Sequence, residues 1–375
     1  MSDPALRSCC IRKILYDRRY CTSTPSAFCR LDKNKSSIKM PLTIQPGRKP
    51  SCARLPAEDP RHPQEQLIVG LVNNMPDPAL EATAAQFCRL LRSAAGPWSV
   101  QLRLAYLPEV PRGKAAYEHV NRAYWHIDEL MGDGPLDGLI VTGLEPVAAS
   151  LSDEPYWERL CALVTWAEQH THSSVWSCLA AHAAVESVDG ITRHRLEKKR
   201  FGVFAHSVLS GNPLTRGIGA QMWTPHSRWN ELPVRELRTA GYTIVSSSPE
   251  TGADIFVRRR GSLFVYFQGH PEYDVAALFK EYRRDVGRFL RGEREQFPEQ
   301  PQGYFPPDTA RELDAFRARA LAERSADLLS GFPTTADCAR ITDTWCAAAV
   351  RIYGNWLSLI AAAKYPTIRV ISAEA

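Results

Sequence analysis

The 375-residue sequence lacks several features that would place it in a special class of protein. No uninterrupted apolar run reaches the roughly 18 residues that a membrane-spanning helix needs. The ten cysteines form no CxxC pair with zinc spacing, which argues against a metal site. No internal repeat or heptad pattern occurs, so solenoids and coiled coils are not expected. What remains is a soluble globular protein, for which an apolar share of 44% is ordinary.

Net charge is also lacking from most of the chain. Residues 1–66 contain 13 Lys+Arg and 6 Asp+Glu, whereas the rest contains 33 and 35. The near-neutral body has no electrostatic footprint for nucleic acid, so no such partner is expected. The basic segment is rich in Pro, Ser and Arg and has weak periodicity. We therefore predict a disordered tail over residues 1–65, with Met40 as a plausible true start of the protein.

The cellular compartment is predicted from the same N-terminal region. No signal peptide is visible, because the stretch CCIRKILYDRRYC lacks an apolar core of the required length. An organelle transit peptide is the alternative, and Asp3, Asp17 and Asp32 count against it. Mostly free thiols in a reducing compartment are expected. The prediction is a cytoplasmic protein with no membrane partner.

Strand and helix patterns alternate four times between residues 66 and 188. Short apolar or alternating runs predict strands at 66–74, 98–107, 136–143 and 173–178, and helical patterns follow each of them. This alternation predicts an α/β fold with a mostly parallel sheet flanked by helices.

The second half of the chain adds strands and then helices. Strands are expected at 202–209, 242–248, 253–260 and 262–269, and helices at 274–291, 308–326 and about 336–364. We predict one domain over residues 66–365, in which 295–365 form a C-terminal helical extension, followed by a tail at 366–375.

Cys178 lies where a buried strand, SSVWSC, meets an alanine-rich helix, LAAHAAVES. This junction is the position of the nucleophile in a nucleophile elbow. It places the thiol at the C-terminal edge of a parallel sheet and at a helix N-terminus, whose partial positive charge stabilises a thiolate. The alternative is a buried structural cysteine, because Trp176 and Ala180 stand where the elbow usually has glycines.

The stretch YFQGHPEYD ends another apolar strand and holds His270 and Glu272 two positions apart. Residues i and i+2 of an extended segment face the same side, and Pro271 disfavours helical conformation at His270. Glu272 can therefore orient the imidazole, which can act as a base for Cys178. A histidine in such a loop is more often structural, but an elbow cysteine followed by a strand and Gly-His-Pro-Glu is a much narrower pattern.

Several stretches resemble the homoserine O-acyltransferase (homoserine O-succinyltransferase) family of methionine biosynthesis, which has a class I glutamine amidotransferase-like fold. They include NNMPDPALEATAAQF, DGLIVTG, TPHSRWNEL, GHPEYD and IYGNWLSLI, in family order over residues 66–360. The resemblance implies Cys178 as the acyl-accepting nucleophile, His270 as the general base and Glu272 as its orienter.

The resemblance also implies residues around the nucleophile. Lys199, Ser227 and Arg284 are implied as substrate contacts, and an arginine fork suits the carboxylate of homoserine. By themselves they are a solvated lysine, a turn hydroxyl and a surface arginine. Backbone amides at Leu179 and around Asn74 and Met75 are expected to stabilise the oxyanion.

Acyl selection is expected at the turn TGLEPV, residues 142–147. In the family, the selecting position is commonly Glu in acetyl users and Gly in succinyl users, and Val147 occupies it here. A neutral valine favours succinyl over acetyl, because it does not repel the second carboxylate. If Glu145 points inward instead, the preference reverses.

The predicted reaction transfers an acyl group, succinyl in preference to acetyl, from acyl-CoA to the hydroxyl of L-homoserine. It proceeds through a cysteine thioester by a ping-pong route. Acyl-CoA is a co-substrate, no other cofactor or metal is expected, and a homodimer is left open. Two alternatives on the same fold also stay open: a Cys-His-Glu hydrolase or glutamine amidotransferase, and a non-catalytic relative.

Overall fold

The computed structural model describes residues 42–47, 66–143, 146–209, 211–334 and 341–366. Its strands are β1 (Leu42–Gln45), β2 (Gln66–Val72), β3 (Ser99–Tyr106), β4 (Trp125–His126), β5 (Leu136–Val141), β6 (Thr171–Ser177), β7 (His194–Val208), β8 (Gln221–Glu231), β9 (Thr243–Ser248), β10 (Gly252–Arg259) and β11 (Leu263–Phe267). Its α-helices are α2 (Asp77–Ala94), α3 (Lys114–Ala123), α4 (Ile127–Gly132), α5 (Trp157–His170), α6 (Leu179–Asp189), α7 (Val234–Thr239), α8 (Ala277–Leu290), α9 (Pro307–Glu323) and α10 (Cys346–Lys364). Short 3-10 helices are η3 (Leu151–Asp153), η4 (Pro213–Thr215) and η5 (Ala326–Gly331).

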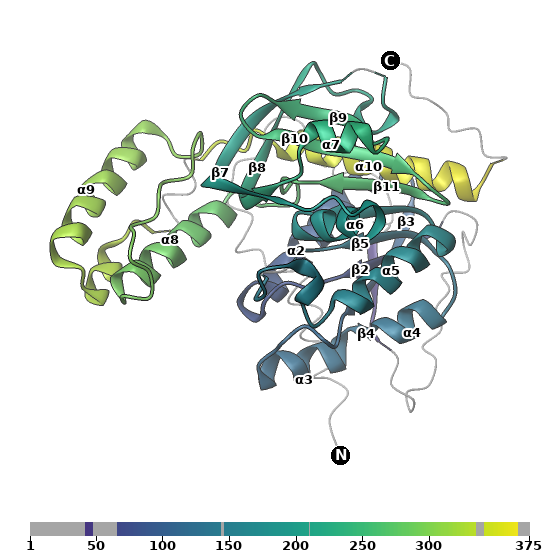
Figure 1. The fold of residues 1–375 in the computed structure, drawn as a ribbon, viewed down its shortest axis with the longest axis horizontal. Coiled ribbons are helices and arrows are strands. Elements are labelled where there is room, and N and C mark those ends of the chain that lie inside the picture. Colours follow the sequence, from purple (N-terminus) through teal and green to yellow (C-terminus); the bar gives the residue numbers. More distant parts are fainter. Residues whose placement is uncertain (1–41, 48–65, 144–145, 210, 335–340, 367–375) are drawn as a thin grey trace, which may run out of the picture.

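The described strands form one sheet with a parallel half and an antiparallel half. Its order is β1-β3-β2-β5-β6-β11-β10-β9-β7-β8, and β4 pairs with β3 beside this path. Every pair from β1 to β11 is parallel, and every pair from β11 to β8 is antiparallel. The alternating pattern of residues 66–188 therefore folds as predicted, into a parallel sheet with helices on both faces (Figure 1).

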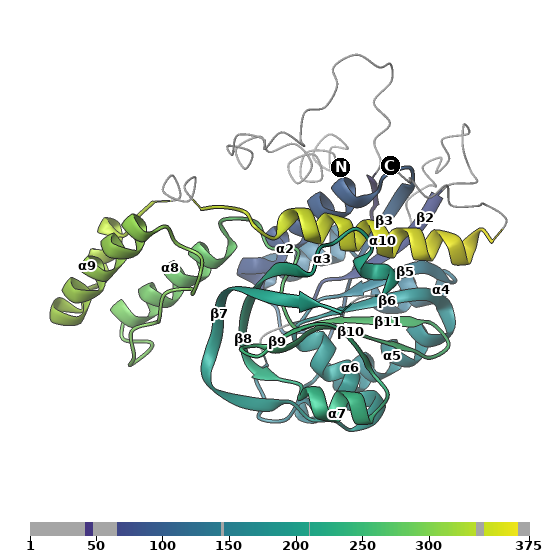
Figure 2. The same cartoon turned by 90° about the horizontal axis from the view of Figure 1, so that it is seen from above.

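Two hydrophobic cores cover the two faces of the sheet. Side chains of α2 and α10 pack on one face, and side chains of α4 to α7 pack on the other. Alternate residues of one strand serve different cores: in β5, Ile140 belongs to the first, and Leu139 and Val141 to the second. Figure 2 shows α10 on one side of the strands and α5 to α7 on the other. Burial on both faces explains why the parallel strands are apolar runs.

Helix α10 is long and apolar enough to meet the criteria for a membrane span, with 19 residues and a mean hydropathy of 1.3. Arg351 interrupts its apolar sequence, and Lys364 is its last residue. The helix also has a buried stripe at helical spacing, which includes Ile352, Trp356 and Ile360. This stripe packs in the core with α2, and Trp356 Nε1 donates to Ser173 Oγ of β6 at 2.9 Å. The contacts are those of a core helix.

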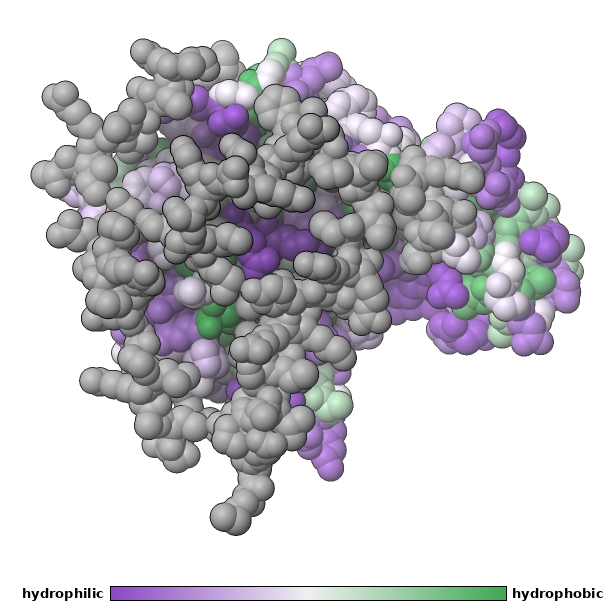
Figure 3. Space-filling model, turned by 180° about the vertical axis from the view of Figure 1, so that it is seen from behind, coloured by the Kyte–Doolittle hydropathy of each residue, from purple (hydrophilic) through white to green (hydrophobic). Residues whose placement is uncertain are grey.

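The helices α8 and α9, with η5, form a lobe beside the sheet (Figure 1). Its own core is largely aromatic and includes Phe279, Tyr282 and Phe316. Seen from behind, the lobe carries hydrophobic side chains among hydrophilic ones (Figure 3). The lobe is placed by α8, which begins ten residues after β11 ends. The loop between β11 and α8 therefore connects the sheet directly to the lobe.

Several elements differ from the prediction for local reasons. The helical pattern expected after the strand at 98–107 forms two helices, because Trp125 and His126 pair with β3 and His126 caps α4 in a capping box with Glu129. Strand β8 was not predicted, since Pro225 lies inside it; the strand is at the sheet edge, where proline is tolerated. The last helix begins at Cys346, ten residues later than expected.

The predicted tail also needs a correction, because Leu42–Gln45 lie inside the fold. This edge strand pairs in parallel with β3, and Leu42 is buried in the first core. Gln45 accepts hydrogen bonds from Arg103 Nε at 2.9 Å and from Trp125 Nε1 at 3.1 Å. Residues 1–41 and 48–65 of the predicted tail lie outside the described residues.

The edge strand β1 gives a test by truncation. A chain that starts at Met40 keeps β1 and should have the same free energy of unfolding as the full chain. A chain that starts at Pro50 loses β1 and should be less stable by about 1.5–3 kcal/mol, the value of burying one leucine. Urea unfolding of both chains measures this, and equal stability of the two truncated chains would contradict it.

Candidate active site

Cys178 lies at a sharp junction between β6 and α6. Its φ is 53° and its ψ is −115°, and only one other non-glycine residue of the described chain, Arg324, has a positive φ. Such a conformation costs of order 1–3 kcal/mol and is concentrated at functional sites. The Cys178 N–H donates to Phe267 O of β11 at 2.7 Å, and the side chain stays partly exposed. The backbone has the sharp strand-to-helix geometry of an elbow, at the residue that the sequence analysis predicted as the nucleophile.

His270 and Glu272 lie in the loop after β11, next to the elbow. Strand β11 pairs in parallel with β6, and Phe267 is opposite Ser177. Both strands therefore end at the same edge of the sheet. His270 Nδ1 donates to Glu272 Oε1 at 2.8 Å, and both side chains are buried. Cys178 is close enough to be one of the groups that raise the pKa of the His270 ring. The structure thus brings the three predicted catalytic residues together.

The charges of the site favour an imidazolium at His270. Burial by itself disfavours the charged ring, but the nearby Cys178 and Glu272 outweigh burial and raise the pKa of His270 well above its usual value. Tyr273 stacks on the ring with 4.3 Å between centroids. A cysteine next to a cationic histidine is the pair used by cysteine nucleophiles.

The amides predicted for the oxyanion are only partly available. The N–H of Asn74 donates to Thr142 Oγ1 at 2.8 Å, and the N–H of Met75 donates to Asn73 Oδ1 at 3.2 Å. Neither amide is free in this structure, so the expectation for Asn74 and Met75 is corrected. Leu179 begins α6, where helix N–H groups have no partner within the helix. A Cβ on Gly143 would lie 2.8 Å from Leu179 N, so a glycine is needed beside this amide.

The loop of Asn74 is hydrogen-bonded by the side chain of Arg112, a residue that the sequence analysis did not identify. Its guanidinium donates to Met75 O at 3.0 Å and to Asn73 O at 3.1 Å, and its side chain is 1% exposed. The loop in turn contacts Thr142, next to Gly143. Arg112 therefore stabilises the loop of Asn74, which in turn contacts the turn after β5, next to the elbow.

The three predicted substrate contacts meet at one carboxylate, Glu281 of α8. Glu281 Oε1 lies 2.7 Å from Lys199 Nζ, 2.5 Å from Ser227 Oγ and 3.6 Å from Arg284. Burial opposes ionisation of Glu281, but Lys199, Ser227 and Arg284 together outweigh it and lower the pKa of the carboxyl. The cluster lies near the predicted catalytic residues: after burial, Glu281, Glu272 and Cys178 are the groups that raise the pKa of Tyr273, whose ring stacks on that of His270.

Comparison with known proteins identifies the family of the chain. Residues 56–367 match the family described as homoserine O-succinyltransferase. The chain belongs to the homoserine O-succinyltransferase family. It is 46% identical over 301 residues to a homoserine O-succinyltransferase of Methylorubrum extorquens, covering 80% of this chain and 89% of the relative. It is 45% identical over 318 residues to one of Bradyrhizobium japonicum, covering 83% and 96%.

Solved structures are more distant. A glutamine amido transferase from Methylobacillus Flagellatus is 15% identical, with a TM-score of 0.43, over 79% of this chain and 95% of that one. At this level of similarity no functional residue is transferred from it.

The structure describes only part of the turn that was expected to select the acyl group in this member of the homoserine O-succinyltransferase family. Val147 is 76% exposed, so it does not fill an enclosed pocket. Glu145 lies outside the described residues. The following loop is anchored by Glu154, which is buried and accepts from Ala148 N at 2.7 Å.

Glu281 was also missed from the sequence, although a signal for it was present. It stands three positions before Arg284 on one helix, which places both on the same face. Arg228 follows Ser227 directly and is almost fully buried, with Cys178 among its electrostatic partners. A buried arginine beside a nucleophile has no sequence signal beyond its place in the PHSR motif.

The Glu272 carboxylate gives a test by titration. Glu272→Gln keeps an oxygen that accepts from His270 Nδ1 but removes a negative charge. Since an anion beside an imidazolium raises its pKa, the pKa of His270 should fall toward its usual value. NMR of the 13C-labelled imidazole against pH measures this, and His270→Ala identifies the resonance. An unchanged or higher pKa in Glu272→Gln would show that Glu272 does not act on His270.

Proposed function

We propose that this protein transfers a succinyl group from succinyl-CoA to the hydroxyl of L-homoserine, through a thioester on Cys178. The observation that carries the proposal is the Cys178–His270–Glu272 arrangement at one sheet edge, next to a cluster with both signs of charge. Membership of the homoserine O-succinyltransferase family supports the substrate pair. The reaction belongs to methionine biosynthesis, and we propose that it takes place in the cytoplasm.

The first half-reaction acylates the cysteine. The Cys178 thiolate attacks the thioester carbonyl, and the Leu179 amide donates to the oxyanion that forms. The tetrahedral intermediate collapses by breaking the bond between the carbonyl carbon and the sulfur of CoA. The proton on His270 goes to the leaving CoA thiolate, which leaves a neutral imidazole and an acyl-enzyme.

The second half-reaction transfers the acyl group to homoserine. Neutral His270 takes the proton of the homoserine hydroxyl, and the oxygen attacks the thioester. The new tetrahedral intermediate collapses to the ester and the Cys178 thiolate, with an imidazolium at His270. Glu272 stabilises that imidazolium in both steps through its hydrogen bond to Nδ1. The starting ion pair is restored, so atoms and charge balance over the cycle.

The cluster around Glu281 is suited to the acceptor. Homoserine carries a carboxylate and an ammonium group, and the cluster offers cations at Lys199 and Arg284 and an anion at Glu281. We propose that the cations bind the carboxylate and that Glu281 and Ser227 bind the ammonium group. A hydroxy acid acceptor without an ammonium group would lack this interaction with Glu281.

The covalent step is tested by mass. Wild-type protein mixed with succinyl-CoA and no acceptor should gain one succinyl group, on the peptide that contains Cys178. Addition of homoserine should remove it. Cys178→Ser is the control and should gain no thioester that homoserine removes. Labelling at Cys88, Cys161 or Cys346, with an active Cys178→Ser protein, would sink the proposed mechanism.

Glu281→Gln tests the acceptor site. A hydrogen bond to a charged group is worth about 1.5–3 kcal/mol, so KM for homoserine should rise about tenfold or more. Release of CoA in the absence of homoserine should keep its wild-type rate, because the donor does not use this carboxylate. Steady-state kinetics with each substrate varied measure both effects. An unchanged KM for homoserine would place the ammonium group elsewhere.

The donor preference is tested by the ratio of kcat/KM for succinyl-CoA and acetyl-CoA at fixed homoserine. We expect succinyl-CoA to be preferred, because Val147 is exposed and neutral and does not repel a second carboxylate. Val147→Glu should shift the ratio toward acetyl-CoA, with Val147→Gln as the uncharged control. A tenfold preference of the wild type for acetyl-CoA, about 1.4 kcal/mol, would reject the expectation.

A further inference from the structure

The backbone N–H groups of Gln268, Gly269 and His270 each donate a hydrogen bond to a residue of another strand. Gln268 N donates to Asp254 O at 2.8 Å, and Gly269 N donates to Asp254 Oδ1 at 3.1 Å. His270 N donates to Pro225 O at 2.8 Å. The loop that presents the imidazole is thus tied to β10 and β8, which lie on the antiparallel side of the sheet.

Asp254 reaches this loop because it is the extra residue of a β-bulge in β10. Ala253 is opposite Ser247, and Ile255 is opposite Ser246, so Asp254 has no residue opposite it. Bulges turn side chains away from the regular strand pattern and recur next to active sites. The side chain is fully buried, and its Oδ2 accepts from Thr224 Oγ1 at 3.0 Å and from Ser246 Oγ at 3.3 Å.

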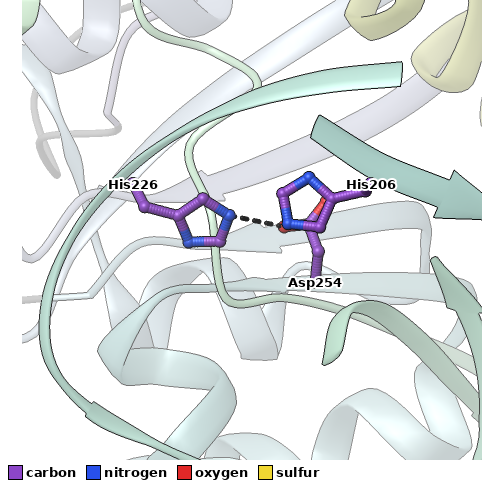
Figure 4. Close-up of side chains that lie close together, drawn as sticks. All are labelled: His206, His226 and Asp254. Carbon is purple, nitrogen blue, oxygen red and sulfur yellow. Dashed lines mark ion pairs between the residues drawn. The ribbon is translucent and has the colours of Figure 1, made fainter. Parts of the chain in front are cut away.

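Gly269 lies directly on a surface made by Thr224, His226 and Asp254, which we call the loop seat. A Cβ on Gly269 would lie 2.5 Å from Thr224 Cγ2, 2.7 Å from Asp254 Oδ1 and 2.9 Å from His226 Nε2. Only a glycine fits at that distance. Figure 4 shows the His226 ring facing the Asp254 carboxylate, with the ring of His206 close by. The backbone next to His270 therefore follows any movement of these side chains.

The hydrogen bonds of His226 determine which ring nitrogen carries its proton. Arg228 Nε can only donate, and it lies 3.2 Å from His226 Nδ1, so Nδ1 accepts. Burial first, and then the charge of Arg228, hold the pKa of His226 well below its usual value, so the ring is neutral. The proton is then on Nε2, which faces Asp254 Oδ1 at 3.5 Å (Figure 4).

This assignment decides between two roles for the cluster of His206, His226 and Asp254. Their ligand atoms lie within 4.8 Å of one another, a grouping that could hold a metal ion. A protonated Nε2 has no lone pair to give to a metal, and Asp254 already accepts from a backbone amide and two hydroxyls. The cluster is therefore built to hold a carboxylate in place and not to bind a metal.

We propose that His226 and Asp254 are positioning residues that fix the His270 imidazole against Cys178 through the loop seat. Arg228 orients the His226 ring, the ring bounds one side of Asp254, and Asp254 holds the two amides before His270. The inference rests on the proposed function in one respect, which is that His270 serves Cys178.

The test measures the rate at which iodoacetamide alkylates Cys178 at neutral pH, read from the mass of its peptide. His226→Leu removes both polar atoms of the ring. It should slow alkylation and kcat together by about tenfold to a hundredfold, since a misplacement of about 1 Å can cost that much. His226→Gln can accept from Arg228 and face Asp254 with an N–H group, and should restore most of both rates.

His206→Leu is the matched control. His206 is equally buried, its ring packs at a tilt against that of His226 with 5.1 Å between centroids, and it hydrogen-bonds to Thr251 at 2.8 Å, outside the loop seat. It should keep the wild-type alkylation rate, whatever its effect on the melting temperature. Equal slowing of alkylation in His206→Leu and His226→Leu would show that the effect comes from lost packing and would overturn the proposal. A folded His226→Leu protein with wild-type rates would also overturn it.

Thr224→Val covers the case in which His226→Leu does not fold. It removes one hydroxyl that donates to Asp254 and keeps the shape of the side chain, and it should slow alkylation in the same direction. A wild-type rate in folded Thr224→Val would then overturn the proposal. His270→Ala distinguishes a failure of the proposed Cys178–His270 pair from a failure of the loop-seat proposal. If it alkylates like the wild type, the proposed Cys178–His270 pair fails; if it alone is slow, only the loop seat fails.

Discussion

The parallel pairing of β6 with β11 is the constraint on which the site depends. Strand β11 begins 86 positions after the last residue of β6. Phe267 nevertheless lies opposite Ser177, and the Phe267 carbonyl accepts a hydrogen bond from Cys178 N. Parallel neighbours end at the same edge of a sheet, so the elbow and the histidine loop meet there. Between them the chain makes β7 to β10, which complete the sheet on the far side of β11.

The rigid sheet holds a local arrangement that is costly by itself. Cys178 has a strained backbone, and His270, Glu272 and Asp254 are buried polar groups that need partners. Two hydrophobic cores on opposite faces of the sheet keep these strands in place. The antiparallel half then supplies the remaining partners through the bulge at Asp254 and the edge strand β8. The lobe adds Glu281 on α8, so Cys178 and Glu281 come from different parts of the fold.

The sequence predicted the parallel half of the fold because buried strands and amphipathic helices alternate there. It missed β8, which contains Pro225 and whose long pairing with β7 has no local signal. Cys178, His270 and Glu272 could be predicted as a group because the elbow and the Gly-His-Pro-Glu loop are local patterns. Asp254 was not, since a bulge breaks the period-two pattern by which strand residues are assigned to faces. Edge strand β1 is too short, at four residues, to stand out from the basic segment around it.

The central claim is that the sheet edge pairs Cys178 with His270 for acyl transfer. Rapid mixing of succinyl-CoA with the protein, followed by measurement of free CoA thiol, tests it most directly. The wild type should release one CoA per active site in a burst before homoserine is added. His270→Ala should release CoA slower by about 10²–10⁴-fold, the usual contribution of a general acid or base. A burst of full size at the wild-type rate in His270→Ala would contradict the account.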